Sequence, residues 1–225
     1  MFSVLIRMGG LIENVRQMIA MAFMGLPLML IAFFFFVGFG LGNVGMIILF
    51  LGQITVVPAA VALSNTLLGF LPLGPYTKVI SRDICNLVPS AKQAGFLSVA
   101  PSYWMAEVLF FVSYLITNAA FLYNEVPQDK AVESKVRHRK EQALTAIILT
   151  TLVTLILVAL RFLVTECETA LGIALAGAVA IPLGVGWYYF ASLCGARNAD
   201  VFGIAAKMLP AGATEPPPMM CVYKA

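Results

Sequence analysis

Charged residues divide this sequence into long apolar runs. No Asp, Glu, Lys or Arg lies between Arg16 and Lys78, a stretch of 61 residues. A helix needs about 20 apolar residues to cross the hydrocarbon of a bilayer, so this stretch has room for two membrane spans. The closely spaced glycines of 38–43 favour a turn over a continuing helix. The pattern therefore predicts two helices joined by a tight turn near residue 40.

Five apolar segments in all are long enough to be membrane spans. Each is expected to be an α-helix, because lipid offers no partners to backbone N–H and C=O groups. The expected spans are 18–38, 44–66, 103–123, 143–164 and 170–194. They predict an all-α, polytopic transmembrane bundle over residues 18–194. The composition, 61% hydrophobic and 11% charged, excludes a soluble globular domain, a disordered chain and a disulfide scaffold.

The two flanks of the bundle have different patterns. Apolar residues of 1–17 fall on one side of a helix and polar ones on the other, which predicts an amphipathic helix in the membrane interface; a frayed N-terminal extension is the alternative. The segment 195–225 contains Pro210 and three consecutive prolines, Pro216–Pro218. That composition favours an extended tail, disordered or lying along a partner protein.

Lys and Arg in the connecting segments favour one orientation. With five spans, the side that includes the N-terminus carries five of them and the opposite side eight. The bias predicts a lumenal or outside N-terminus and a cytoplasmic C-terminus. Cys85 and Cys167 would then share the oxidising side and are candidates for a disulfide; the alternative is that all four cysteines are unpaired thiols.

Small residues recur every four positions in the last span. Such a stripe lets another helix backbone approach closely, inside the bundle or at a contact between protomers. The residues are Gly172, Ala176, Ala180 and Gly184. Trp104 and residues 187–189, near opposite ends of their spans, are expected in the aromatic belts at the two interfaces.

The third span carries a polar and aromatic face. Tyr103, Glu107, Phe111, Tyr114 and Asn118 fall within about 60° of one another around a helix. A carboxyl inside a span is by default a candidate functional site. For Glu107 the candidate partners are Gln53, Ser64, Asn65 and Arg161. The alternative is a structural role, in which Glu107 reaches the nearby interface or holds an ion pair within the bundle.

The segment 124–141 is the most charged part of the chain and a candidate docking surface. Its basic residues are Lys130, Lys135, Arg137, Arg139 and Lys140. Their positive excess suits anionic lipid headgroups or an acidic partner. Acidic residues alternate with them, so a nucleic-acid partner is not expected.

No motif for catalysis, phosphate binding or metal ligation is present, and the sequence predicts no enzyme, no cofactor and no metal. The only histidine, His138, lies in the charged loop, where a solvated basic face accounts for it. Glu166 and Glu168 flank Cys167; paired acids can bind a cation, but two solvated loop carboxylates are the expected state. The unequal spans also lack the internal repeats of most transporters.

Residues 101–111 and 117–123 resemble a span of small multi-spanning membrane proteins from nucleocytoplasmic large DNA viruses. The resemblance extends over the stretch 101–123, about 23 residues. It implies a structural role in the lipid membrane beneath an icosahedral capsid, and it carries over no catalytic residue.

Three functional hypotheses remain. The first is an integral membrane structural protein whose charged loop and tail contact an overlying protein layer, such as a coat. The second is an accessory subunit of an organellar membrane complex, packed through the small-residue stripe. The third is a small oligomeric channel or transporter using Glu107 and Asn118.

Overall fold

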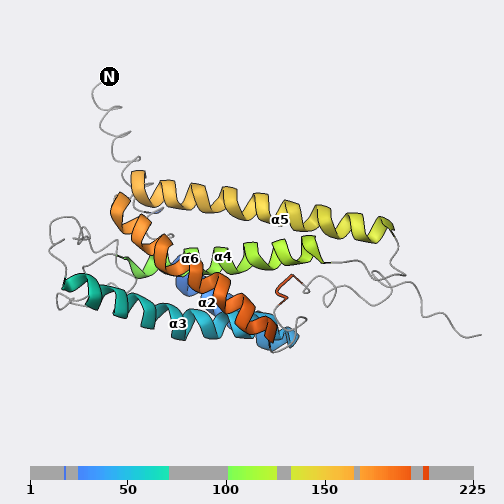
Figure 1. The fold of residues 1–225 in the computed structure, drawn as a ribbon, viewed down its shortest axis with the longest axis horizontal. Coiled ribbons are helices and arrows are strands. Elements are labelled where there is room, and N and C mark those ends of the chain that lie inside the picture. The colour runs from blue at the N-terminus through green and yellow to red at the C-terminus, as the bar shows by residue number, and fades with distance from the viewer. Residues whose placement is uncertain are drawn as a thin grey trace, which may run out of the picture.

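A computed structural model of the chain describes residue 18 and residues 25–70, 101–125, 133–164, 168–193 and 200–202. Its elements, in chain order, are the α-helices α2 (Leu26–Leu41), α3 (Val44–Gly69), α4 (Tyr103–Asn124), α5 (Glu133–Ala159), the π-helical turn η2 (Leu160–Val164) that continues α5, and α6 (Ala170–Leu193). No strand occurs among the described residues. The prediction of an all-α bundle is confirmed (Figure 1).

Four of these helices are long and apolar enough to cross a membrane. They are Val44–Leu68, Tyr103–Asn124, Val136–Leu163 and Ala170–Leu193. The helix α2 has 16 residues, or about 24 Å at 1.5 Å per residue, which is less than the roughly 30 Å of bilayer hydrocarbon. The expected first span, 18–38, thus overlaps α2, but the described helix is shorter and ends three residues later.

The turn between α2 and α3 is tighter than the glycine cluster predicts. Only Gly42 and Asn43 lie between the two helices, because Gly38 and Gly40 continue α2. Gly42 has a φ of 60°, in the left-handed region that suits glycine. Asn43 caps α3 by accepting a hydrogen bond from the Met46 backbone N–H at 3.2 Å. A side chain at Gly38 would press on Met46, with Cβ atoms 3.1 Å apart, so this glycine lets the two helices approach.

The centre of the bundle is α4, the most buried of the four membrane-length helices. It packs against α3, α5 and α6, and α5 is the least buried (Figure 1). The structure buries all four small residues of the α6 stripe, Gly172, Ala176, Ala180 and Gly184. A Cβ at Gly184 would collide with the Ser113 hydroxyl and the Phe110 carbonyl oxygen of α4. The stripe is therefore a contact inside this chain.

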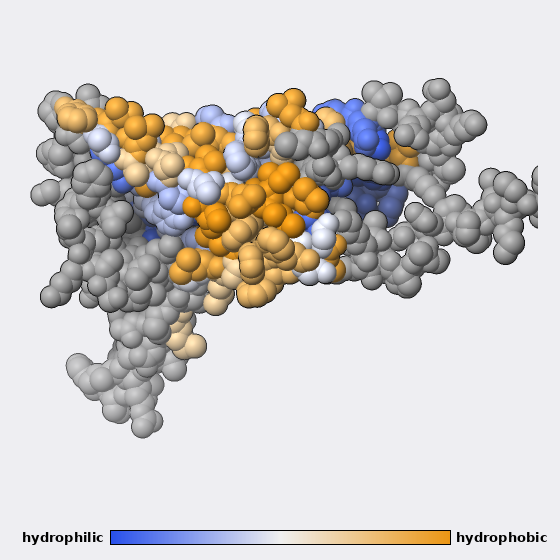
Figure 2. All heavy atoms as spheres, turned by 90° about the horizontal axis from the view of Figure 1, so that it is seen from below, coloured by the Kyte–Doolittle hydropathy of each residue, from blue (hydrophilic) through white to orange (hydrophobic). Residues whose placement is uncertain are grey.

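Apolar side chains also cover the outside of the bundle. Large hydrophobic residues such as Phe36, Ile148 and Leu155 are exposed, and Figure 2 shows hydrophobic residues over the middle of one face with hydrophilic residues toward one end. Apolar surface on this scale is typical of a face that lipid covers. The chain is a multi-pass protein embedded in a membrane.

Two of the aromatic residues do not lie in interfacial belts. Trp104 is 2% exposed and Tyr188 is 1% exposed, since both pack inside the bundle. Trp187 is partly buried and donates a hydrogen bond to the Ile48 carbonyl of α3 at 2.9 Å. Of these residues only Tyr189 is exposed enough to face the interface as expected.

Several predictions fall outside the described residues. They are the amphipathic helix 1–17, the Cys85–Cys167 disulfide, Lys130 and the tail beyond residue 202. Lys135 lies in α5, but its side chain is not described.

Candidate functional site in the membrane bundle

Four polar residues predicted as an intramembrane site are all buried. Glu107, Tyr114 and Asn118 line the α4 face that packs into the bundle, and Arg161 lies in η2. Because α4 is packed on α3, α5 and α6, the polar side chains of its predicted face are buried among helices and do not meet lipid. The four residues nevertheless do not form one cluster, and each end of α4 has its own set of contacts.

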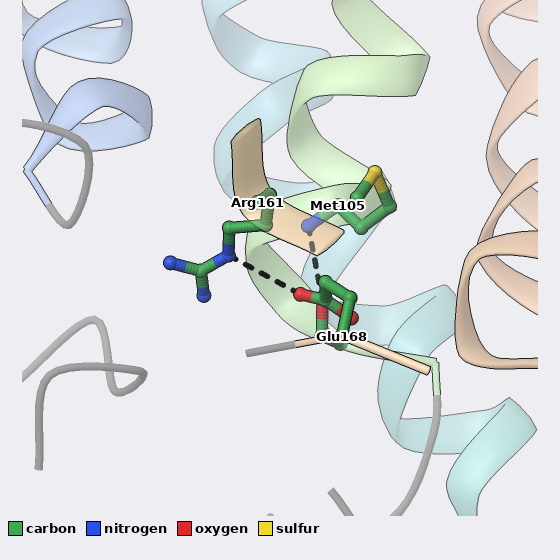
Figure 3. Close-up of polar contacts among 4 residues, drawn as sticks. Met105, Arg161 and Glu168 are labelled. Carbon is green, nitrogen blue, oxygen red and sulfur yellow. Dashed lines mark hydrogen bonds and ion pairs between the residues drawn. The ribbon is translucent and has the colours of Figure 1, made fainter. Parts of the chain in front are cut away.

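The first cluster joins the start of α4, the η2 turn at the end of α5, and the start of α6. Arg161 Nε lies 3.4 Å from Glu168 Oε1, and both side chains are buried (Figure 3). Ser102 donates a hydrogen bond to the same carboxyl oxygen at 2.5 Å. The Arg161 guanidinium also lies over the Trp104 ring, 4.7 Å from its centre, a cation–π geometry. Three helix ends are therefore held together by one carboxylate and one guanidinium.

Helix caps place these groups. The Ser102 hydroxyl caps α4 by accepting from the Met105 N–H at 3.1 Å, and Thr169 caps α6 by accepting from the Gly172 N–H at 3.0 Å. Glu168 directly precedes that cap, where the helix dipole of α6 favours a negative charge. Burial raises the pKa of the Glu168 carboxyl, while the Ser102 hydrogen bond and Arg161 act to lower it. The expectation of a solvated loop carboxylate at Glu168 is wrong, because Glu168 is buried between Ser102 and Arg161.

Glu107 does not pair with Arg161. It is 1% exposed, and neither of its carboxyl oxygens has a hydrogen-bond partner among the described residues. Tyr103, one turn earlier in α4, is close enough to interact with it electrostatically. Of the candidate partners of Glu107, Arg161 instead pairs with Glu168, which is only seven residues away in the sequence.

Gln53 of α3 is a second buried polar residue whose side-chain atoms form no hydrogen bond with the described residues. It is fully buried, and neither atom of its side-chain amide makes a hydrogen bond in the described part of the chain. It follows Gly52, where an added Cβ would collide with the Trp187 ring of α6 and lie 2.8 Å from the Phe110 ring of α4, so two aromatic side chains pack directly on the α3 backbone at this level. The packed interior of α3 and α4 thus holds two polar side chains whose hydrogen-bonding capacity is unused.

The second cluster lies at the other end of α4. Asn118 donates a hydrogen bond to Asp200 at 3.3 Å, and Asp200 also accepts from the Phe202 backbone N–H at 2.9 Å. The Tyr114 ring meets the Tyr188 ring edge-on, with centres 5.4 Å apart. Sequence reasoning missed Asp200 and placed it in an extended tail. Residues 200–202 instead fold back onto the bundle, and the signal was an acidic residue beside the apolar Val201, which is buried.

The predicted basic surface is partly neutralised by its own acidic neighbours. Arg139 donates to the Glu125 carboxylate and to the Glu125 carbonyl, both at 2.7 Å. Arg137 pairs with Glu141 at 2.9 Å. Lys140 lies over the Tyr123 ring, 5.5 Å from its centre. These side chains stand where α4 ends and α5 begins, at one end of the bundle.

The geometry gives no group of three metal-binding side chains within the described residues. Comparisons with known proteins add no family, because no family model, curated protein or solved structure matches the chain. Function therefore has to be argued from the bundle itself.

Proposed function

We propose that this protein is an integral membrane structural protein that anchors or organises an overlying protein layer. The observation that supports the proposal is the position of Asp200. Its contact with Asn118 near the end of α4 puts the start of the tail at the same end of the bundle as the α4–α5 connection. Both candidate docking segments, 124–141 and the tail, would then face one side of the membrane.

The proposal extends to the orientation of the protein in the membrane and to the kind of layer that it contacts. The excess of Lys and Arg on that side would make it cytoplasmic. Residues 101–123 resemble a span of membrane proteins from nucleocytoplasmic large DNA viruses, so a capsid is the first overlying layer to test. Contact with an acidic protein surface would use basic side chains such as Lys140, which has no ion pair among the described residues.

Deletion of residues 213–225 is expected to abolish retention of the partner layer while leaving the bundle intact. The deletion keeps Asp200 and its contacts, so helical content and thermal unfolding in detergent should not change. The measurement is gentle-detergent purification from the native source, followed by mass spectrometry of the proteins that stay bound. A matched control replaces 213–225 by a Gly/Ser segment of equal length. Normal co-purification with the deleted chain would contradict the proposal.

The accessory-subunit hypothesis needs a different surface from the one first expected. The small-residue stripe of α6 packs against α4, so it is occupied within the chain. A subunit interface would have to use another face, such as the exposed side of α5.

A second candidate function, a small oligomeric channel or transporter, is favoured by Glu107 alone. An intramembrane carboxyl whose oxygens accept no hydrogen bond from the described residues is expensive to keep and typical of ion or proton pathways. If Glu107 carries protons or cations, Glu107→Gln should abolish flux in reconstituted vesicles. If the protein is a scaffold, the Glu107→Gln variant should fold normally, and neither the unaltered protein nor the variant should show flux. The variant Gln53→Leu, at the other buried polar residue, tests whether a buried polar group in general, rather than the carboxyl, is responsible.

A further inference from the structure

A groove lies on α4 where α5 and α6 separate. Figure 1 shows that α6 starts beside the end of α5 and then runs away from it, while both helices pack on α4. The groove has a volume of about 270 Å³. Its walls include Leu109 and Thr117 of α4, Thr151 and Leu155 of α5, and Ile181 and Val185 of α6. These positions are near the middle of their spans, so the groove lies at mid-depth in the bilayer.

Three of the four hydroxyl groups in this groove are bonded to carbonyl groups of their own helices. Thr117 donates to the Ser113 carbonyl at 2.7 Å, and Thr154 donates to the Thr150 carbonyl at 2.7 Å. Ser113 donates to the Phe110 carbonyl at 2.9 Å. The wall therefore presents methyl and methylene groups, and it suits an aliphatic chain rather than a polar ligand.

A second hollow, of about 410 Å³, lies where α4 ends and α5 begins. It is lined by Tyr123, Val136, Arg137, Lys140, Glu141 and Leu144. The membrane-length part of α5 starts at Val136, so this hollow is at the level of the lipid headgroups. Arg137 and Lys140 exceed the one acidic side chain, Glu141, by one positive charge, which matches the single negative charge of a phosphodiester.

The two hollows lie on the same side of the same two helices. Leu144 in the outer hollow and Thr151 in the groove are seven residues apart on α5, close to two full turns, or about 10 Å along the axis. On α4, Tyr123 in the outer hollow and Ile116 in the groove are also seven residues apart, so they share one face and lie about 10 Å apart along the axis. One leaflet contributes about half of the roughly 30 Å of hydrocarbon. The spacing therefore fits a lipid with its headgroup at the interface and its chain toward the midplane.

We propose that one phospholipid binds along the seam between α4 and α5, with its phosphate at Arg137 and Lys140 and one acyl chain in the groove beside Thr151 and Leu155. The site recognises the lipid at two points. Electrostatic attraction holds the headgroup, and Tyr123 closes the outer hollow as an interfacial aromatic residue. Burial of the acyl chain against three helices fills the gap that the divergence of α6 leaves. This lipid site requires only that the protein is inserted in a membrane, and it does not depend on the proposed scaffold role.

The test is native mass spectrometry of the full chain in mild detergent with added dioleoylphosphatidylglycerol. One phospholipid should remain bound per chain, and dioleoylglycerol, which lacks the phosphate, should be retained at least 10-fold less. The double variant Arg137→Gln, Lys140→Gln and, separately, the groove-filling variant Thr151→Phe should each reduce retention at least 10-fold. Millimolar inorganic phosphate should not displace the lipid, because it cannot use the groove.

Arg139→Gln is the matched control, since it removes one positive charge from the same helix outside the hollow. It should retain lipid as the unaltered chain does, and circular dichroism should show that all variants are folded. Unchanged retention in Thr151→Phe, or equal losses in Arg139→Gln and the double variant, would overturn the proposal. The first result would exclude the groove, and the second would indicate a diffuse attraction of anionic lipids.

Discussion

Glu168→Ala is expected to destabilise the bundle by about 3–5 kcal/mol, the range for breaking a buried ion pair by removing one partner. The variant leaves the Arg161 guanidinium buried without its carboxylate, and it removes the group that accepts from Ser102. Three helix ends lose their common contact at once. The measurement is the free energy of unfolding by sodium dodecyl sulfate in mixed micelles, followed by helical content.

A double-mutant cycle separates the pair from the rest of the site. Arg161→Met with Glu168→Met removes both charges and keeps apolar volume, so the double variant should be more stable than the sum of the single losses by at least about 1 kcal/mol. Glu125→Ala is the control, because its partner Arg139 is in a more exposed ion pair, for which a loss of about 0–1 kcal/mol is expected. If the losses of unfolding free energy at Arg161 and Glu168 were additive, the two residues would not be energetically coupled.

Gly184→Ala is expected to destabilise the protein by about 1–3 kcal/mol, the usual cost of overpacking a well-packed interior. The new methyl group would collide with the Ser113 hydroxyl and with the Phe110 carbonyl oxygen. A hydroxyl can rotate away, but a backbone carbonyl cannot, so α4 and α6 must separate. Gly184→Val should prevent the native packing altogether. Both effects are measured as the change in unfolding free energy in mixed micelles.

Gly186 provides a matched control two residues further along α6. An added Cβ there meets nothing within 4 Å. Gly186→Ala should be neutral or stabilise the helix by up to about 1 kcal/mol, from helix propensity alone. If the two alanine variants behaved alike, helix propensity rather than close packing of α4 on α6 would govern this face.

The helices of this protein could be predicted because the hydrophobic effect acts on whole segments. Uninterrupted apolar runs set the positions of α3, α4 and α6, and the four-residue period of Gly172–Gly184 indicated the face that packs. The expected span 143–164 covers only the apolar part of α5, whose first turns are charged and lie outside the apolar run. Glu133 begins a helix that simply continues into the span.

The pairing of polar groups could not be predicted in the same way. Choosing between Glu107 and Glu168 as the partner of Arg161 requires the rotation of three helices about their axes and the path of one connection. Apolar residues surround every candidate, so hydropathy cannot discriminate between them. The same is true of Asp200, whose contact with Asn118 joins residues 82 positions apart in the sequence.

Trp104 shows why an interfacial position along the chain does not imply an interfacial side chain. It occupies the second position of α4, as a belt residue would, but α4 is surrounded by other helices. Its ring therefore covers Arg161 instead of meeting headgroups. Depth can be counted from sequence, whereas the direction in which a side chain points depends on neighbours.

The two-residue connection between α2 and α3 bears on how the protein is made. Gly42 and Asn43 are both uncharged, the Asn43 side-chain oxygen accepts from the Met46 N–H, and the Asn43 backbone N–H donates to the Gly38 carbonyl. Insertion of this pair of helices from one side of a bilayer therefore moves no charged loop through the hydrocarbon. During biosynthesis the pair can enter the lipid as a single unit, ahead of α4 and the polar groups that α4 later buries.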